Sequence, residues 1–156
     1  MGHTIEVRKT SRSRRFDRAT LAPLARRVVG RVLAGEGVRN AEVGVLFVDN
    51  PVIQALNRRY RRRNRPTDVL AFALAEPDEI RRPGVALGDV VISLPTARRQ
   101  AEERGHPPED EVVLLLIHGT LHLLGYDDEE PAAAERMRAK EKTYLTQLKV
   151  RSIEDR

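Results

Sequence analysis

The sequence contains no cysteine and no tryptophan, and only 4% of its 156 residues are aromatic. The absence of cysteine excludes disulfides and thiolate chemistry. The scarcity of aromatic residues argues against a platform on which nucleic-acid bases would stack, so a contact with nucleic acid would be made mainly to the phosphate backbone.

Long apolar runs are also missing. No stretch approaches the roughly 18 consecutive apolar residues of a membrane-spanning helix, and the opening MGHTIEVRKTSRSRR lacks the apolar run of a signal peptide. We therefore expect a cytoplasmic protein.

A chain of 156 residues, 40% of them hydrophobic, favours one compact core over two, and we predict a single domain over residues 1–156.

Basic residues outnumber acidic ones, 28 against 23, which gives a net charge of 28 − 23 = +5 and a pI near 10.1. Nearly all of the cations are arginines, whose planar guanidinium binds phosphate oxygens two at a time. This composition favours a polyanionic partner such as nucleic acid. The alternative is that the arginines reflect genomic base composition or heat tolerance.

Helical and strand-like patterns alternate along the chain. Asn50 is predicted to cap a helix that starts at Pro51, and Gly105 and Gly125 are predicted to end helices. The pattern predicts a single α+β domain with a mixed sheet of about four strands and about five helices. The expected strands are 5–9, 42–49, 69–74 and 85–94, and the expected helices are 19–33, 51–60, 95–105, 107–125 and 131–148.

His118 and His122 lie four residues apart on an apolar helix, which places both imidazoles on one face with Cβ atoms roughly 5–6 Å apart. The glycine turn at Gly125 would fold the following chain back toward them. The resulting spacing, HxxxHxxGxxD, predicts a catalytic zinc site with Asp128 as third ligand and a water in the fourth position. Asp127 remains an alternative third ligand.

The competing interpretation is a pair of core histidines, with Asp127 or Asp128 merely capping the next helix. Even with a metal, one feature restricts the chemistry. Metalloproteases of the HExxH type carry a glutamate base directly after the first histidine, and Gly119 stands there in this chain. A metal-bound water with a nearby cation would suit a phosphodiester better than a peptide bond.

Arginines crowd the end of the helix predicted to reach Tyr60 and the loop after it. Like charges crowded together are costly unless a polyanion offsets their repulsion, so the segment is a candidate phosphate-binding track. A solvated helix end, stabilised by the helix dipole, is the alternative. The arginines are Arg58, Arg59, Arg61, Arg62, Arg63 and Arg65.

Residues 118–130, HGTLHLLGYDDEE, resemble the motif HGxLHLxGYDH of the YbeY endoribonucleases, in which three histidines bind zinc, and ten of the eleven positions agree. The segments at 56–72, LNRRYRRRNRPTDVLAF, and 87–93, LGDVVIS, are similar to family segments in the same order. The resemblance implies a single-strand-specific endoribonuclease that matures ribosomal RNA, particularly the 3′ end of the small-subunit species, and acts in ribosome quality control. It also implies that Arg61 holds the scissile phosphate.

Two positions depart from the family pattern. Asp128 stands where the family has its third histidine, which makes the identity of the metal less certain because a carboxylate is a harder ligand than an imidazole. Ala71 stands where the family often has serine. Two other functions remain open: a non-catalytic ribosome-assembly factor that binds RNA and partner proteins and carries a structural metal, and a metalloprotease with a base from Glu129 or Glu130.

Overall fold

A four-stranded mixed sheet organises the molecule, in a computed structural model that describes residues 2–153. The strand order is β1-β2-β4-β3, with β1, β2 and β4 parallel and β3 antiparallel to β4. The predicted α+β class with about four strands and five helices is confirmed over these residues. The strands are β1 (Thr4–Lys9), β2 (Glu42–Val48), β3 (Val69–Ala73) and β4 (Ala86–Ser93).

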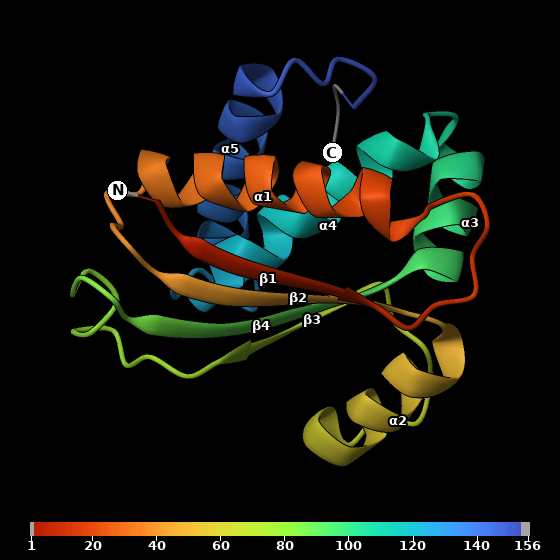
Figure 1. Ribbon diagram of the computed structural model, residues 1–156, viewed down its shortest axis with the longest axis horizontal. Helices are drawn as coiled ribbons and strands as arrows, with labels where there is room; N and C mark the ends of the chain where they lie inside the picture. The colour runs from red at the N-terminus through yellow and green to blue at the C-terminus, as the bar shows by residue number, and fades with distance from the viewer. Residues whose placement is uncertain (1, 154–156) are drawn as a thin grey trace.

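The helices are distributed unequally over the two faces of the sheet. Figure 1 shows α1, α4 and α5 over one face and α2 alone against the other, with α3 following the end of β4. None of the described helices is long and apolar enough to cross a membrane. Their bounds are α1 (Arg18–Gly35), α2 (Asn50–Arg61), α3 (Leu94–Arg104), α4 (Pro108–Leu123) and α5 (Pro131–Gln147).

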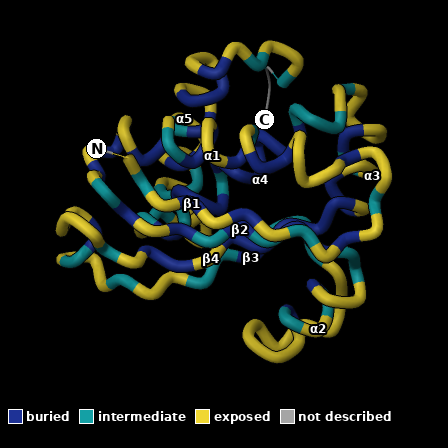
Figure 2. The backbone as a smooth tube through the Cα atoms, in the orientation of Figure 1, coloured by how far each residue is buried: buried dark blue, intermediate teal, exposed yellow. Residues whose placement is uncertain are grey.

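The main hydrophobic core lies between the sheet and the helices α1, α4 and α5. Helix α4 is apolar on nearly every side, a pattern that requires burial all round, and Figure 2 shows it as the most deeply buried helix. A smaller cluster fills the space between α2 and the opposite face of the sheet. It consists of Val48, Ile53, Leu70 and Val91.

The predicted capping role of Asn50 is wrong. The N-cap of α2 is Asp49, which makes no side-chain capping bond. Its carboxylate instead accepts hydrogen bonds from the hydroxyl of Ser11 and from the backbone N–H of Arg12. Asn50 is already inside the helix, and its Oδ1 accepts from the hydroxyls of Ser93 at 2.6 Å and Thr96 at 2.8 Å. Asn50 thus connects the start of α2 to the start of α3.

Candidate metal centre

Helix α4 brings the two predicted histidines together. The Nε2 atoms of His118 and His122 lie 3.1 Å apart and their ring centroids 4.6 Å apart. The helix ends beyond Leu123, and Gly125 adopts a φ of +98°, a left-handed conformation that glycine accepts without strain. The chain therefore turns back across the histidines, as the glycine spacing predicted.

Asp128 completes a three-residue cluster on the returning chain. Its Oδ2 lies 3.8 Å from Nε2 of His118, and one ligand atom from each of His118, His122 and Asp128 lies within 4.8 Å of the others. Asp127 lines the same cleft but is not part of this cluster, and its carboxylate accepts a hydrogen bond from the backbone N–H of Glu129 at 3.2 Å. The cluster could hold a metal ion, and its geometry favours Asp128 over Asp127 as the third ligand.

The protonation of the two imidazoles suits metal binding. Nδ1 of His118 lies 2.5 Å from Oε2 of Glu141. Since a carboxylate can only accept, this contact favours the tautomer with its proton on Nδ1, in which Nε2 carries the lone pair for a ligand bond. Burial, and then the neighbouring His118, lower the pKa of His122, so its imidazole is neutral at physiological pH. Neutral imidazoles and a carboxylate are a donor set that fits Zn²⁺ and similar divalent ions.

Glu141 is the site residue that the sequence analysis missed. It lies on α5, and its side chain is only 3% exposed. The signal that could have found it is its position in the apolar stripe of that helix, at helical spacing from the buried Met137, Tyr144 and Leu145. An acid in such a stripe needs a buried partner, and here His118 provides it.

Gly119, where HExxH proteases carry their base, packs tightly on the sheet. A Cβ atom at this position would lie 2.5 Å from a methyl group of Val90 and 3.2 Å from one of Val69. The residue after His118 therefore faces β3 and β4, and the site has no base at this place. The close approach also lets α4 sit low enough on the sheet for His118 to reach the cleft.

Gly119→Ala is expected to destabilise the protein although alanine favours helices. The new methyl group would displace the stiff, buried side chain of Val90, at a cost of about 1–3 kcal/mol that exceeds the gain in helix propensity of about 1 kcal/mol. Gly30→Ala in α1 is the matched control, since nothing lies within 4 Å of its added Cβ, and it should stabilise. Urea denaturation measures both, and an equal gain in the two variants would contradict the close packing at Gly119.

The cluster opens onto a cleft of about 630 Å³ at the β3 edge of the sheet, and both basic and acidic side chains line this cleft. The basic ones are Arg61, Arg63 and Arg65, and Ala71 of β3 lies beside them; the acids besides Asp128 are Asp68, Asp127 and Glu129. Arg61 donates a hydrogen bond of 2.7 Å to the carbonyl oxygen of Ala71, and its guanidinium carbon lies 5.1 Å from the ring centre of Phe72. The predicted arginine track is therefore divided, because Arg58, Arg59 and Arg62 are not among the residues that line this cleft.

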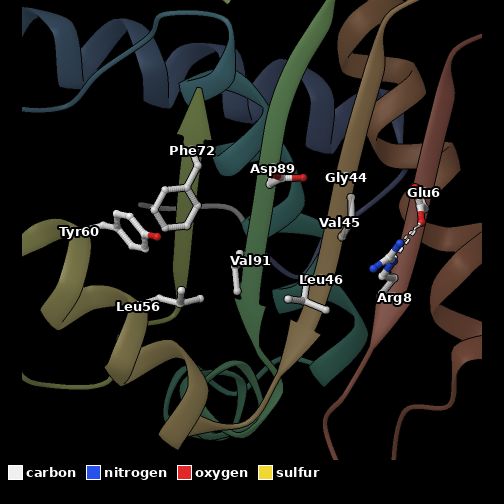
Figure 3. Close-up of a pocket in the computed structure, with 10 residues that line it drawn as sticks. All are labelled: Glu6, Arg8, Gly44, Val45, Leu46, Leu56, Tyr60, Phe72, Asp89 and Val91. Carbon is white, nitrogen blue, oxygen red and sulfur yellow. Dashed lines mark hydrogen bonds and ion pairs between the residues drawn. The ribbon is translucent and has the colours of Figure 1, made fainter. Parts of the chain in front are cut away.

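A second groove, of about 620 Å³, lies on the sheet face that α2 covers only in part. Figure 3 shows Leu56 and Tyr60 of α2 on one side and the acid Asp89 on the sheet floor. Its other acid, Glu6, is paired with Arg8 at 2.7 Å. Since its described residues provide no group of three metal ligands, the metal chemistry of the sequence motif belongs to the β3 cleft.

Comparisons with known proteins show which proteins the chain is similar to. The sequence model described as Endoribonuclease YbeY matches residues 6–149. The chain is 48% identical over 132 residues to the endoribonuclease YbeY of Desulforamulus reducens (82% of this chain, 86% of the relative) and 47% identical over 132 residues to that of Moorella thermoacetica (80% and 85%). A Thermotoga maritima protein solved in solution is similar in fold, with a TM-score of 0.65, 25% identity and 97% of each chain covered.

Proposed function

Because the chain belongs to the endoribonuclease YbeY family and is an endoribonuclease that acts in the processing of ribosomal RNA, we propose that it cleaves single-stranded RNA. Its active centre is the cluster of metal ligands at the end of α4 and in the loop after it. The observation that carries this proposal is the position of His118, His122 and Asp128 in the same cleft as Arg61, Arg63 and Arg65. A ligand set for a divalent ion and a set of phosphate-binding cations thus share one cavity.

The three ligands leave room for the reaction. Structural zinc sites are closed by four protein ligands, whereas catalytic sites use three and keep one position open. His118, His122 and Asp128 are three, and the cleft lies beside them. When bound, the ion would supply Lewis-acid catalysis and the acidified water that hydrolysis requires. We propose Zn²⁺ because two imidazole nitrogens and one carboxylate oxygen match its preferences.

Arg61 is the proposed phosphate-binding residue. Its exposed guanidinium donates to the carbonyl oxygens of Ala71 and Tyr60 and lies over the ring of Phe72, so its position is set before substrate arrives. The remaining donors can bind two oxygens of one phosphate and stabilise the negative charge that increases in the transition state. Arg63 and Arg65 line the same cleft and would contact neighbouring phosphates of the strand.

The two other candidate functions find less support. A purely structural metal would need a fourth protein ligand, and the described cluster provides three. A protease of the HExxH type would need a base after the first histidine, where Gly119 instead packs against Val90. The proposed substrate is ribosomal RNA in the cytoplasm. The proposed cleavage region is the 3′ end of the small-subunit RNA.

Metal analysis tests this function with a matched pair of variants. Wild-type protein purified without chelator should contain about one zinc per chain and cleave single-stranded RNA, and a strong chelator should abolish cleavage until zinc is restored. Loss of a residue that only supports a metal ligand lowers metal affinity roughly 10–100-fold. Because Asp128 is proposed to be a ligand itself, Asp128→Ala should lower zinc affinity by more than this. Asp127→Ala removes the same charge one residue away and should keep the affinity of the wild type.

The contrary results are clear. A wild-type protein that binds no zinc, or an Asp127→Ala variant that loses it while Asp128→Ala does not, would rule out the ligand set given above. Cleavage that continues undiminished in chelator would rule out the metal as part of the active centre.

A further inference from the structure

A buried carboxylate behind the metal centre joins three elements of the fold. Glu36 caps the C-terminal end of α1, and its side chain is only 4% exposed. Its Oε1 accepts a hydrogen bond of 2.6 Å from the hydroxyl of Tyr126, which follows α4. Its Oε2 accepts one of 2.5 Å from Tyr144 and an ion-paired contact of 3.1 Å from Lys140, both on α5.

The chemistry of this cluster keeps it assembled. Burial alone would raise the pKa of Glu36, but the three donors outweigh it and hold the pKa below its ordinary value. Burial and the adjacent carboxylate raise the pKa of both Tyr126 and Tyr144, so the hydroxyls remain donors. Gly35 makes room for the arrangement, since a Cβ atom there would lie 2.4 Å from Oη of Tyr144.

The third metal ligand has little support of its own. The side chain of Asp128 is 52% exposed, and its contact with His118 is 3.8 Å long. The position of its carboxylate therefore depends on the backbone of the loop that carries it. Tyr126, two residues earlier, is the last residue before Asp128 that packs against the hydrophobic core. Its backbone N–H donates to Leu121 at 3.1 Å, and its hydroxyl donates to Glu36.

We propose that Glu36 and Tyr126 are positioning residues for the metal centre, which hold the loop after α4 so that the carboxylate of Asp128 stays within reach of His118 and His122. The inference rests on the ligand set of the proposed function. Helix α5 contributes to both sides of the centre. Its Glu141 contacts His118, and its Lys140 and Tyr144 both contact Oε2 of Glu36, so Lys140 still holds this carboxylate when the hydroxyl of Tyr144 is removed.

Tyr126→Phe and Tyr144→Phe form a matched pair for the test. Each variant removes one hydroxyl that donates to Glu36, and each keeps the ring, but only Tyr126 belongs to the loop of the third ligand. Tyr126→Phe is expected to weaken zinc binding about 10–100-fold, as loss of an outer-shell partner does. Tyr144→Phe should lower the melting temperature of the metal-free protein yet leave zinc affinity within about twofold of the wild type. Competition with a chromogenic chelator gives the affinities, and calorimetry gives the melting temperatures.

A double-mutant comparison separates positioning from general loosening. If Tyr126 acts through Asp128, then Tyr126→Phe added to Asp128→Ala should change zinc affinity by less than about twofold. Equal losses of affinity in the two phenylalanine variants, or no loss in Tyr126→Phe, would overturn the inference alone. Unchanged affinity in Asp128→Ala itself would instead refute the ligand set, and the inference with it.

Discussion

Arg61→Ala is expected to reduce RNA cleavage by roughly 10²–10³-fold, the usual effect of removing one preorganised donor to a developing negative charge. The bound metal should remain, because Arg61 makes its described contacts with Tyr60, Ala71 and Phe72 and none with the three ligands. Cleavage of a labelled single-stranded RNA, measured beside the zinc content of the same preparation, separates the two effects. Arg61→Lys should recover only part of the rate, since an ammonium group cannot bind two phosphate oxygens with one planar fork.

Arg59→Ala is the matched control for Arg61→Ala. It removes the same charge two residues earlier on α2, but its guanidinium lies 5.3 Å from the ring of Tyr60 and does not line the metal cleft. Its effect should be a modest loss of RNA affinity that disappears at higher salt, as expected for a general electrostatic contribution. Equal rates for Arg61→Ala and wild type would show that Arg61 does not act on the scissile phosphate.

His118→Ala and His122→Ala are expected to abolish zinc binding and, with it, cleavage. Each removes one of three ligands, which leaves two donors for an ion that needs at least three from the protein. Added zinc should raise the melting temperature of the wild type and of neither variant, because an ion stabilises only the folded state that binds it. Without metal, His118→Ala should be the less stable variant, since it leaves Glu141, 3% exposed, without this partner.

His106→Ala provides the comparison for the two ligand variants. This histidine is also held by a buried acid, with Nε2 2.5 Å from Oε1 of Glu111, but it lies two residues before α4 and outside the metal cluster. Its loss should lower stability and leave one zinc per chain. Full zinc content in His118→Ala or in His122→Ala would contradict the centre described here.

Local signals explain the part of the fold that the sequence predicts. The helical repeat of α4, the turn at Gly125 and the helix stop at Gly105 each depend on residues close in the chain, and each is found in the structure. Asn50 shows where such signals fail. Its side chain can accept from its own helix or from Ser93 and Thr96, and only the packing of α2 against α3 decides between them.

The centre itself could be predicted only in part for the same reason. Because His118, His122 and Asp128 lie within eleven residues, their spacing alone suggests a site. Glu141 is 23 residues from its partner His118 and Glu36 is 90 from Tyr126, so neither contact has a sequence signature. The shared cleft with Arg61 depends on the strand order, which places β3 at the edge of the sheet.

The position of β3 at the edge of the sheet also affects whether copies of the protein aggregate. An outer strand offers unpaired backbone groups to which a strand of another chain can add, and such pairing leads to aggregation. On β3 the carbonyl oxygen of Ala71 already accepts a hydrogen bond from Arg61, and Arg63 and Arg65 line the same cleft. We therefore expect Arg61, the residue proposed to bind an RNA phosphate, to protect this edge as well, since it occupies a backbone acceptor that a second strand would need.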